Sequence, residues 1–165
     1  MTNKVTQMIT QPRRINRSFA LAITVLALAA CGSNPPDRAA GSRVSAGDMA
    51  ASVALDQVGE PYRYGGNSPG GFDCSGLVQY SYSRAGYSVP RTTRQLWSAA
   101  ETVDRHELRA GDLLFFSIQG KMSHVGLYLG EQRFVHAPQS GRSVSVESLQ
   151  APVYRTAFIR AGRLY

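Results

Sequence analysis

The hydrophobic pattern of this 165-residue chain changes its period at Gly111, and this change limits the folds that the chain can adopt. Before Gly111 the apolar residues recur at helical spacing, in segments that glycine ends. After Gly111 the segments are short, rich in β-branched and aromatic residues, and separated by turn residues. Helices that precede an antiparallel sheet predict an α+β fold, with N-terminal helices packed on a small antiparallel β-sheet.

The pattern predicts three helices and five strands. The first helix starts at Ser45, in a sequence typical of a capping box, and it ends at Gly59. Further helices begin at Asp73 or Cys74 and near Thr92, and a loop rich in glycine and aromatic residues precedes the second helix. The predicted strands are Asp112–Phe116, His124–Leu129, Arg133–His136, Ser143–Val146 and Ala157–Arg160.

Residues 1–30 have the features of a secretory signal peptide. A basic stretch without any acidic residue precedes an apolar run, Phe19–Ala30, that ends in small residues. This run is too short for a membrane span, which needs about 20 residues. Either Met1 or Met8 can be the start of the chain, because the basic stretch is long.

Cys31 follows this apolar run directly. The segment Leu28–Gly32 resembles the lipobox of bacterial lipoproteins, and the resemblance implies that Cys31 carries the lipid and becomes the new N-terminus. The alternative is an ordinary signal peptide with an incidental cysteine. Gly32 after the cysteine resembles lipoproteins sent to the outer membrane. We therefore expect a lipid anchor at Cys31 that holds the protein in the bacterial envelope, on the outer membrane and facing the periplasm.

The rest of the chain divides into a tether and one domain. Residues 31–44 are small and polar and contain Pro-Pro, which predicts a flexible tether behind the lipidated end. Residues 45–165 are long enough for one modest core. Without the signal peptide the chain keeps 14 basic and 11 acidic side chains, a net charge of +3. Since this charge is mild and forms no basic stripe with aromatics, no nucleic-acid partner is expected.

Cys74 is the candidate nucleophile. Only two cysteines occur, Cys31 and Cys74, so a disulfide framework is not indicated. Cys74 stands at the predicted start of a helix, where the partial positive charge of the helix dipole favours the thiolate and lowers the thiol pKa. Asp73 can cap the free N–H groups there. A buried structural cysteine is the alternative, but the core positions of this helix fall at Leu77 and Val78.

Two histidines are placed to assist this thiol. His124 begins one predicted strand and His136 ends the next, so a hairpin through Gly130 brings both imidazoles near one sheet face. One histidine can accept the thiol proton and the second can fix its tautomer, with two surface histidines as the alternative. His106 lies in a charged turn and is expected in solvent. One cysteine and scattered histidines do not make a zinc pattern, so no metal is expected.

Six motifs, in order, resemble those of the NlpC family of peptidoglycan endopeptidases, most closely its small lipoprotein members of the Spr murein-endopeptidase type. The motifs are Gly59–Gly66 (GEPYRYGG), Phe72–Leu77 (FDCSGL), Pro90–Thr93 (PRTT), Leu108–Leu113 (LRAGDL), His124–Tyr128 (HVGLY) and Phe134–Ala137 (FVHA). Each motif alone is short, but six in register are specific, and together they cover about residues 46–160. The resemblance implies a papain-like NlpC fold of the α+β class.

The resemblance also implies the catalytic roles. Cys74 is the nucleophile, His124 the base and His136 the residue that orients the base. Tyr62 matches a family tyrosine whose hydroxyl helps to form the oxyanion hole beside the backbone N–H of Cys74; a packed loop aromatic is the alternative. No metal or organic cofactor is implied.

Four residues are candidates for binding the substrate, which the resemblance identifies as peptidoglycan stem peptides. Asp73 and Ser75 match positions that line the cleft, although Asp73 can equally be a plain helix cap. Arg91 and Arg94 are expected beside the Cys74 helix, where a guanidinium can bind a stem carboxylate bidentately. Solvated surface charges are the alternative for both arginines.

The sequence therefore predicts a monomeric cell-wall hydrolase that cleaves amide bonds in stem peptides or their cross-links by a Cys-His-His mechanism. The bond is open between D-Ala to diaminopimelate across strands and γ-D-Glu to diaminopimelate within one strand. An N-acetylmuramoyl-L-alanine amidase of similar fold is the nearest enzymatic alternative, because one fold class hosts several reactions. A non-catalytic wall-binding lipoprotein is the alternative from another class, and it would tolerate the loss of Cys74.

Overall fold

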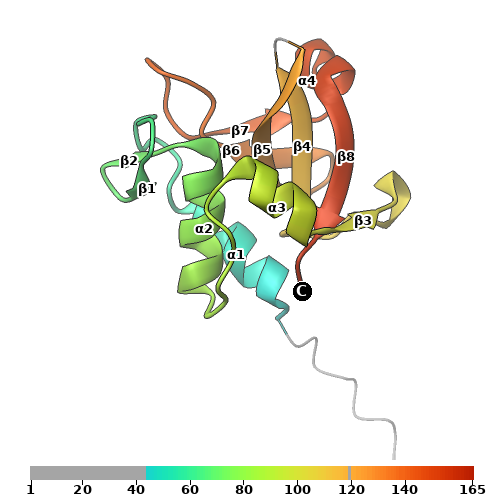
Figure 1. Ribbon diagram of the computed structural model, residues 1–165, viewed down its shortest axis with the longest axis horizontal. Coiled ribbons are helices and arrows are strands. Elements are labelled where there is room, and N and C mark those ends of the chain that lie inside the picture. Colours follow the sequence, from blue (N-terminus) through green and yellow to red (C-terminus); the bar gives the residue numbers. More distant parts are fainter. Residues whose placement is uncertain (1–43, 119) are drawn as a thin grey trace, which may run out of the picture. The chain divides into compact units, whose positions relative to one another are not determined.

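The computed structural model describes residues 44–118 and 120–165, and Figure 1 shows the arrangement of their elements. Helices α1 (Ala46–Leu55), α2 (Cys74–Arg84) and α3 (Thr93–Ala99) precede the long strands, and α4 (Pro152–Ala157) lies between the last two. The predicted α+β fold is therefore confirmed. The predicted signal peptide, Cys31 and all of the tether before residue 44 lie outside the described residues. Among the residues that are described, no helix is long and apolar enough to cross a membrane.

Six antiparallel strands form the main sheet, in the order β3-β8-β4-β5-β6-β7. Their bounds are β3 (Glu101–Val103), β4 (Leu113–Ile118), β5 (Lys121–Gly130), β6 (Arg133–His136), β7 (Ser145–Ser148) and β8 (Phe158–Arg163). Five of these strands overlap the predicted ones. The sixth, β3, was not predicted because an edge strand of three residues is too short to show a period. It pairs with β8, where Thr102 lies opposite Gly162.

The first helix ends earlier than predicted. Ser45 caps it as expected, and the capping box with Asp48 is complete. The helix stops at Leu55, however, and the chain turns before it reaches Gly59. The N–H of Gly59 donates to the carbonyl oxygen of Val144 at 2.9 Å, so a tertiary hydrogen bond takes the place of a helical one.

The hairpin that brings the two histidines together is present. β5 and β6 pair with Leu127 opposite Val135. The residues between them, Glu131 and Gln132, both have positive φ (51° and 58°), as the tight turns of two-residue hairpins require. This short turn sets the register of the hairpin, because a two-residue loop fixes which residues of the two strands face each other.

Alternation along the strands gives the sheet two apolar faces. Against α1, α2 and α3 pack Leu113, Phe115, Val125, Leu127 and Val135. A second cluster contains Leu114, Phe116, Tyr128 and Phe134, with Tyr154 and Ala157 of α4 packed against it. His124 precedes Val125 and His136 follows Val135, so both histidines fall in phase with the second face.

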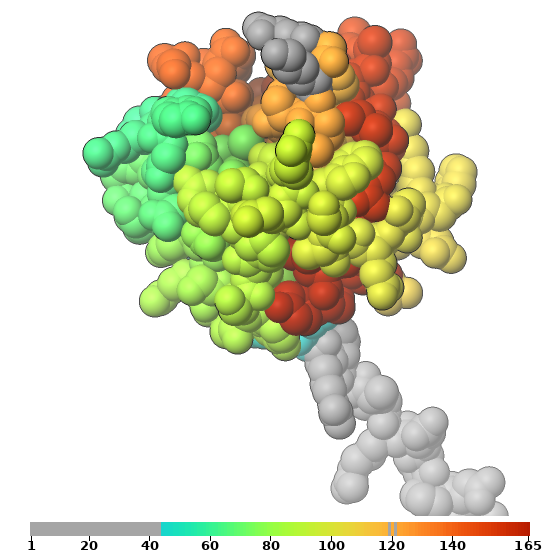
Figure 2. Space-filling view, in the orientation of Figure 1, coloured from blue at the N-terminus to red at the C-terminus, as the bar shows by residue number. Residues whose placement is uncertain are grey.

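Glycine allows a loop to cross the start of α2. This loop carries the short hairpin of β1 (Asn67–Ser68) and β2 (Gly71–Phe72). A side chain at Gly76 would overlap the carbonyl oxygen of Gly66. Figure 2 shows the loop and the α2–α3 region exposed on one face of the molecule.

Candidate active site

Cys74 lies where three segments meet. It is the first residue of α2, and its thiol is free. Its Sγ lies 3.7 Å from Oγ1 of Thr93 and 3.9 Å from the carbonyl oxygen of Ser123. The pairing of β4 with β5 shifts register after Phe116, which leaves Ser123 as an extra residue, and such bulges re-aim a strand. The predicted nucleophile therefore lies against the residue that precedes His124.

The resting thiol is not the thiolate that the sequence predicted. Burial raises the pKa of Cys74, and the neighbouring carboxylate of Asp73 adds to this rise. Hydrogen bonds that involve Thr93 and the backbone of Val125 and Ser75 lower the pKa, but they do not offset burial. The predicted lowering of the Cys74 pKa is therefore wrong for this structure, because the loss of water on burial outweighs the hydrogen bonds that favour the thiolate. The thiol needs a base to ionise.

His124 and His136 form a buried pair. Nε2 of His124 lies 2.6 Å from Nδ1 of His136, and the two residues are only 6% and 1% exposed. Burial lowers the pKa of His124 to about 4. Burial, with repulsion from His124 and Arg142, lowers the pKa of His136 to about 3. Both rings are therefore neutral near pH 7, which is the form that can accept a proton.

The hydrogen bond between the rings limits where a proton can enter. It occupies Nε2 of His124, so Nδ1 is the ring nitrogen of His124 that is left to accept a proton. Nε2 of His136 in turn lies 3.3 Å from the hydroxyl of Tyr154. Because Ser123 and His124 are consecutive, the group around the thiol and the group around the imidazoles meet at β5.

A hollow of about 510 Å³ opens over the thiol. Tyr62 lines it from the loop before α2, and the N–H of Tyr62 donates to the carbonyl oxygen of Arg142 at 2.8 Å. Burial raises the pKa of Tyr62, and the nearby Cys74 and Asp73 raise it further. Its hydroxyl therefore keeps its proton and can donate a hydrogen bond into the hollow.

Arg91 is bound to Asp73. Its guanidinium donates to the two carboxylate oxygens at 3.0 and 2.7 Å and to Oγ of Ser75 at 3.0 Å. Burial by itself raises the pKa of Asp73, but hydrogen bonds from Arg91, Gly76 and Gly65 hold it below its ordinary value. All three polar side chains line the hollow. The alternative that Arg91 is a solvated surface charge is therefore wrong.

Two other charged candidates lie elsewhere. Arg94 is exposed on α3 and does not line the hollow. His106 is exposed, as expected, in the 3-10 helix η1 (Arg105–Glu107), where its N–H donates to Asp104 at 2.8 Å. In residues 44–118 and 120–165, no group of three or more His, Cys, Asp or Glu side chains could hold a metal ion.

Thr93 and Tyr154 touch the site. The sequence placed Thr93 in a segment beside the cleft, around Pro90–Arg94, but it gave neither residue a role of its own. Thr93 belongs to the motif Pro90–Thr93, but nothing in the sequence separates its hydroxyl from that of Thr92, which caps α3. Tyr154 comes 18 residues after His136, in a six-residue helix that is too short to show a period. The only local sign of that helix is Pro152 at its first turn.

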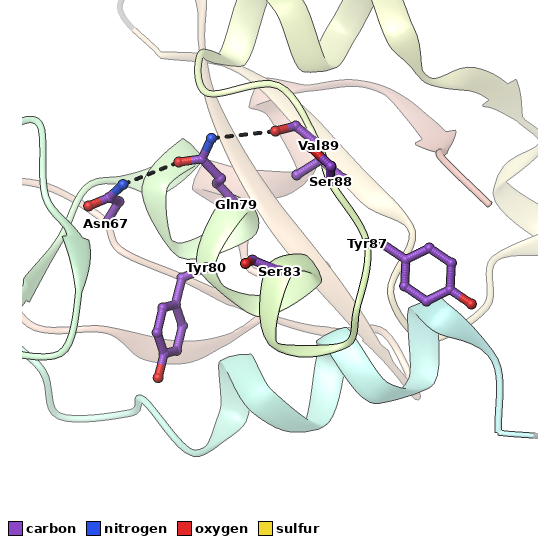
Figure 3. A pocket seen from close by; sticks show the side chains of 7 residues that line it. All are labelled: Asn67, Gln79, Tyr80, Ser83, Tyr87, Ser88 and Val89. Carbon is purple, nitrogen blue, oxygen red and sulfur yellow. Dashed lines mark hydrogen bonds between the residues drawn. The ribbon is translucent and has the colours of Figure 1, made fainter.

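A second hollow, of about 280 Å³, lies beside α2 and shares no lining residue with the first. Figure 3 shows Gln79 held on both sides: its amide oxygen accepts from Asn67 at 3.2 Å, and its amide nitrogen donates to the carbonyl oxygen of Val89 at 3.4 Å. The walls contain no cysteine, histidine, carboxylate, lysine or arginine. Its serine and tyrosine hydroxyls therefore have no histidine, carboxylate or lysine in the lining to activate them as nucleophiles.

A cysteine starts a helix, its thiol lies beside Ser123 of β5, and the next residue of that strand belongs to a histidine pair on the antiparallel sheet. These features define a fold of the papain-like class. Within that class the chain belongs to the NlpC/P60 family, whose family model matches residues 59–163. The resemblance seen in the six sequence motifs is thereby confirmed.

Three relatives show the extent of the match. Murein DD-endopeptidase MepH of Escherichia coli K12 is 38% identical over 122 residues, which cover 70% of this chain and 45% of that protein. The bifunctional muramidase/DL-endopeptidase CwlT of Bacillus subtilis 168 is 39% identical over 115 residues, or 67% of this chain and 34% of that protein. The crystal structure of the NlpC/p60 domain of the peptidoglycan hydrolase SagA has a TM-score of 0.62 at 36% identity and covers 71% of this chain and 97% of that one. The chain spans less than half the length of MepH and of CwlT.

Proposed function

We propose that this chain is a cysteine endopeptidase that hydrolyses amide bonds in peptidoglycan stem peptides or in their cross-links. The observation that carries the proposal is the position of Cys74: its Sγ lies 3.9 Å from the carbonyl oxygen of Ser123, and the next residue, His124, is hydrogen-bonded to His136. A thiol, a base and a group that orients the base are what this kind of nucleophilic catalysis requires. The names of MepH and CwlT, a DD- and a DL-endopeptidase, support the substrate class.

The reaction begins with a proton transfer. Burial keeps the thiol protonated and the imidazole neutral, so Nδ1 of His124 takes the proton as Sγ of Cys74 attacks the carbonyl carbon of the substrate. A C–S bond forms, and an electron pair moves onto the carbonyl oxygen. The backbone N–H of Cys74, which has no intrahelical partner, and the hydroxyl of Tyr62 donate to this oxygen.

The amine leaves in the next step. His124 gives its proton to the leaving nitrogen, the C–N bond breaks, and the acyl group stays on Sγ of Cys74 as a thioester. A water molecule that gives a proton to the same ring then attacks the thioester, which releases the carboxylate product and restores the thiol. His136 holds Nε2 of His124 throughout, which keeps Nδ1 available to the reacting groups.

Digestion of purified peptidoglycan by the full chain tests the proposal. We expect mass spectrometry to find stem peptides cut internally or at cross-links, and to find no such fragments with the Cys74→Ala variant. Cleavage of cross-linked dimers alone would identify a cross-link endopeptidase, and cleavage between the second and third residues of free stems would identify the other bond. Free glycan with intact stems would indicate an amidase. No release by the unmodified chain would favour a wall-binding protein.

We also propose that the protein is anchored to the envelope through a lipid on Cys31, at the outer membrane and facing the periplasm. The support is the sequence alone: the lipobox-like Leu28–Gly32 after a basic stretch and an apolar run. Metabolic labelling with a fatty-acid analogue should mark the unmodified chain and leave Cys31→Ser unlabelled. A labelled Cys31→Ser variant would contradict the anchor.

The chain is further proposed to act as a monomer. One copy of the described residues supplies the thiol, the histidine pair and the wall of the hollow, so no second copy is needed to complete the site. Sedimentation of the detergent-solubilised chain at several concentrations should give one mass, and a concentration-dependent dimer would contradict this.

A further inference from the structure

Helix α4 brings a tyrosine to the far end of the histidine pair. The hydroxyl of Tyr154 lies 3.3 Å from Nε2 of His136, on the side away from His124. The ring of Tyr154 stands nearly perpendicular to the ring of His136 (87°) and to that of Phe134 (84°), with centroids 5.3 and 5.0 Å apart. The ring of Tyr154 also makes an edge contact with the ring of Phe116, and their centroids lie 5.7 Å apart. The hydroxyl is therefore held in place by packing on three aromatic rings.

Three groups thus form one chain of hydrogen bonds, and such a chain can run in two directions. In the first direction His124 donates from Nε2 to Nδ1 of His136, and His136 donates from Nε2 to the hydroxyl of Tyr154. In the second direction Tyr154 donates to His136, and His136 donates to His124. The proton of His124 then sits on Nδ1, because Nε2 is the acceptor.

Only the first direction leaves His124 able to act as a base. In it Nδ1 carries a free lone pair, whereas in the second direction Nδ1 is already protonated and cannot take the thiol proton. Whether the Tyr154 hydroxyl accepts or donates is therefore coupled to whether Nδ1 of His124 carries a proton.

The proposed mechanism selects the first direction, because only that direction leaves Nδ1 of His124 free for the thiol proton. Burial and the carboxylate of Glu147 raise the pKa of Tyr154, whereas Arg142 lowers it, and the hydroxyl keeps its proton. A hydroxyl oxygen carries lone pairs as well as a proton, so Tyr154 can accept from Nε2 of His136, 3.3 Å away.

From this geometry we propose that Tyr154 is a positioning residue that selects the base-competent tautomer of the His124–His136 pair by accepting a hydrogen bond from His136. The proposal rests on the proposed function for its catalytic meaning. The tautomers themselves exist whether or not the chain hydrolyses peptidoglycan, so they provide an independent readout.

The first experiment compares two tyrosine-to-phenylalanine variants of the full chain. Tyr154→Phe keeps the ring packing and removes the acceptor. Tyr128→Phe is the matched control, because Tyr128 lies in the same apolar cluster and its hydroxyl accepts from the N–H of Gln132, at 3.2 Å, not from a histidine. We expect Tyr154→Phe to lower kcat on muropeptides about 3- to 10-fold with an unchanged KM, the loss that one hydrogen bond produces. Tyr128→Phe should keep the wild-type kcat.

The second experiment reads the tautomers directly by 15N NMR of histidine-labelled chain. The chain has three histidines, and the exposed His106 supplies a reference signal from outside the buried pair. We expect both His124 and His136 to carry their proton on Nε2 in the wild type and in Tyr128→Phe. In Tyr154→Phe we expect part of the His124 population to carry it on Nδ1.

These measurements separate the two proposals. If the unmodified chain cuts no peptidoglycan, the proposed function fails while the NMR comparison still decides the role of Tyr154. A wild-type His124 protonated on Nδ1 would overturn the inference without any variant. So would a folded Tyr154→Phe chain with wild-type tautomers, or one whose kcat equals that of Tyr128→Phe when the wild type is active.

Discussion

Nε2 of His124 lies 2.6 Å from Nδ1 of His136, and this bond joins the two strands of a hairpin at the point where almost no water reaches either ring. The two histidines are therefore not equivalent. His124 follows the residue whose carbonyl faces the thiol, whereas His136 lies one ring further away, against Tyr154. Each position predicts a different consequence of substitution.

The first prediction concerns the rate. His124→Ala should lower kcat/KM by about 10²–10⁴-fold, because the variant has no general base for the thiol proton. His136→Ala should cost less, because the base remains and only its orientation is lost. Muropeptide hydrolysis under matched conditions measures both, and His106→Ala, on an exposed turn, should keep the wild-type rate. A fully active His124→Ala chain would rule out the mechanism.

The second prediction concerns acid stability. The folded-state pKa values of the two rings, about 4 and about 3, lie below the unfolded value of about 6.5. Between pH 6.5 and 3 the unfolded chain binds protons that the folded chain does not. The free energy of unfolding therefore has the full contribution of the neutral rings above pH 6.5 and loses it as the pH falls through this window.

Urea unfolding at pH 7, 5.5 and 4.5 measures this loss as a falling midpoint. These values stay above the range in which Asp73, whose pKa is lowered, takes up a proton. His136→Gln removes one titrating ring and should flatten the pH dependence. A midpoint that does not depend on pH would contradict the burial of neutral histidines.

The third prediction is that Cys74→Ala abolishes hydrolysis and keeps the fold. The thiol is at the first position of α2, where its removal takes few atoms from the core. Cys74→Ser should also be inactive, because a hydroxyl is a far weaker nucleophile than a thiol with a neutral imidazole as its base. Thermal unfolding of both variants should match the wild type. Stem fragments released by Cys74→Ala would show that another group is the nucleophile.

Much of the candidate site could be predicted from the sequence because its residues mark element boundaries. Cys74 follows a helix cap, His124 and His136 flank a hairpin, and Ser45 starts a capping box. Each of these signals depends on residues that are neighbours in the sequence, so it can be recognised without the tertiary structure. The histidines could be assigned to one sheet face because strands alternate with a fixed period of two.

The other features depend on tertiary contacts that local patterns do not carry. The raised pKa of Cys74 comes from burial of the thiol, against which Thr93 of α3 and Ser123 of β5 lie. The ion pair between Arg91 and Asp73 joins residues 18 positions apart in the sequence, and the hydrogen bond between Tyr154 and His136 spans the same separation. Neither α4 nor β3 is long enough to show a period, so their neighbours could not be predicted either.

The fourth prediction contrasts two arginines. Arg91→Ala leaves the carboxylate of Asp73, which is only 13% exposed, without its bidentate partner, and should lower the free energy of unfolding by about 1–3 kcal/mol. Arg91→Lys should recover only part of this loss, because an ammonium keeps the positive charge but cannot make both hydrogen bonds. Arg94→Ala on the exposed side of α3 should change the stability little. Urea unfolding measures all three, and equal effects of Arg91→Ala and Arg94→Ala would contradict the ion pair's role.

The same variants test the predicted binding of substrate carboxylates. Arg91 is already occupied by Asp73 and Ser75, and Arg94 does not line the hollow. We therefore expect Arg94→Ala to keep the wild-type KM for muropeptides. A large rise in the KM of Arg94→Ala would instead support the substrate contact that the sequence suggested.

The last prediction concerns Gly76, where the loop before α2 crosses the helix start. A Cβ at this position would overlap the carbonyl oxygen of Gly66, which accepts from the N–H of Asp73 at 3.0 Å. Gly76→Ala must therefore displace backbone and should cost about 1–3 kcal/mol of stability, the usual cost of overpacking. Because the same loop carries Tyr62, kcat/KM should fall as well, with Ser83→Ala, exposed on the same helix, as the control. Thermal unfolding and muropeptide hydrolysis measure the two effects, and a Gly76→Ala chain with wild-type stability and activity would mean that the loop is not held against the helix as described.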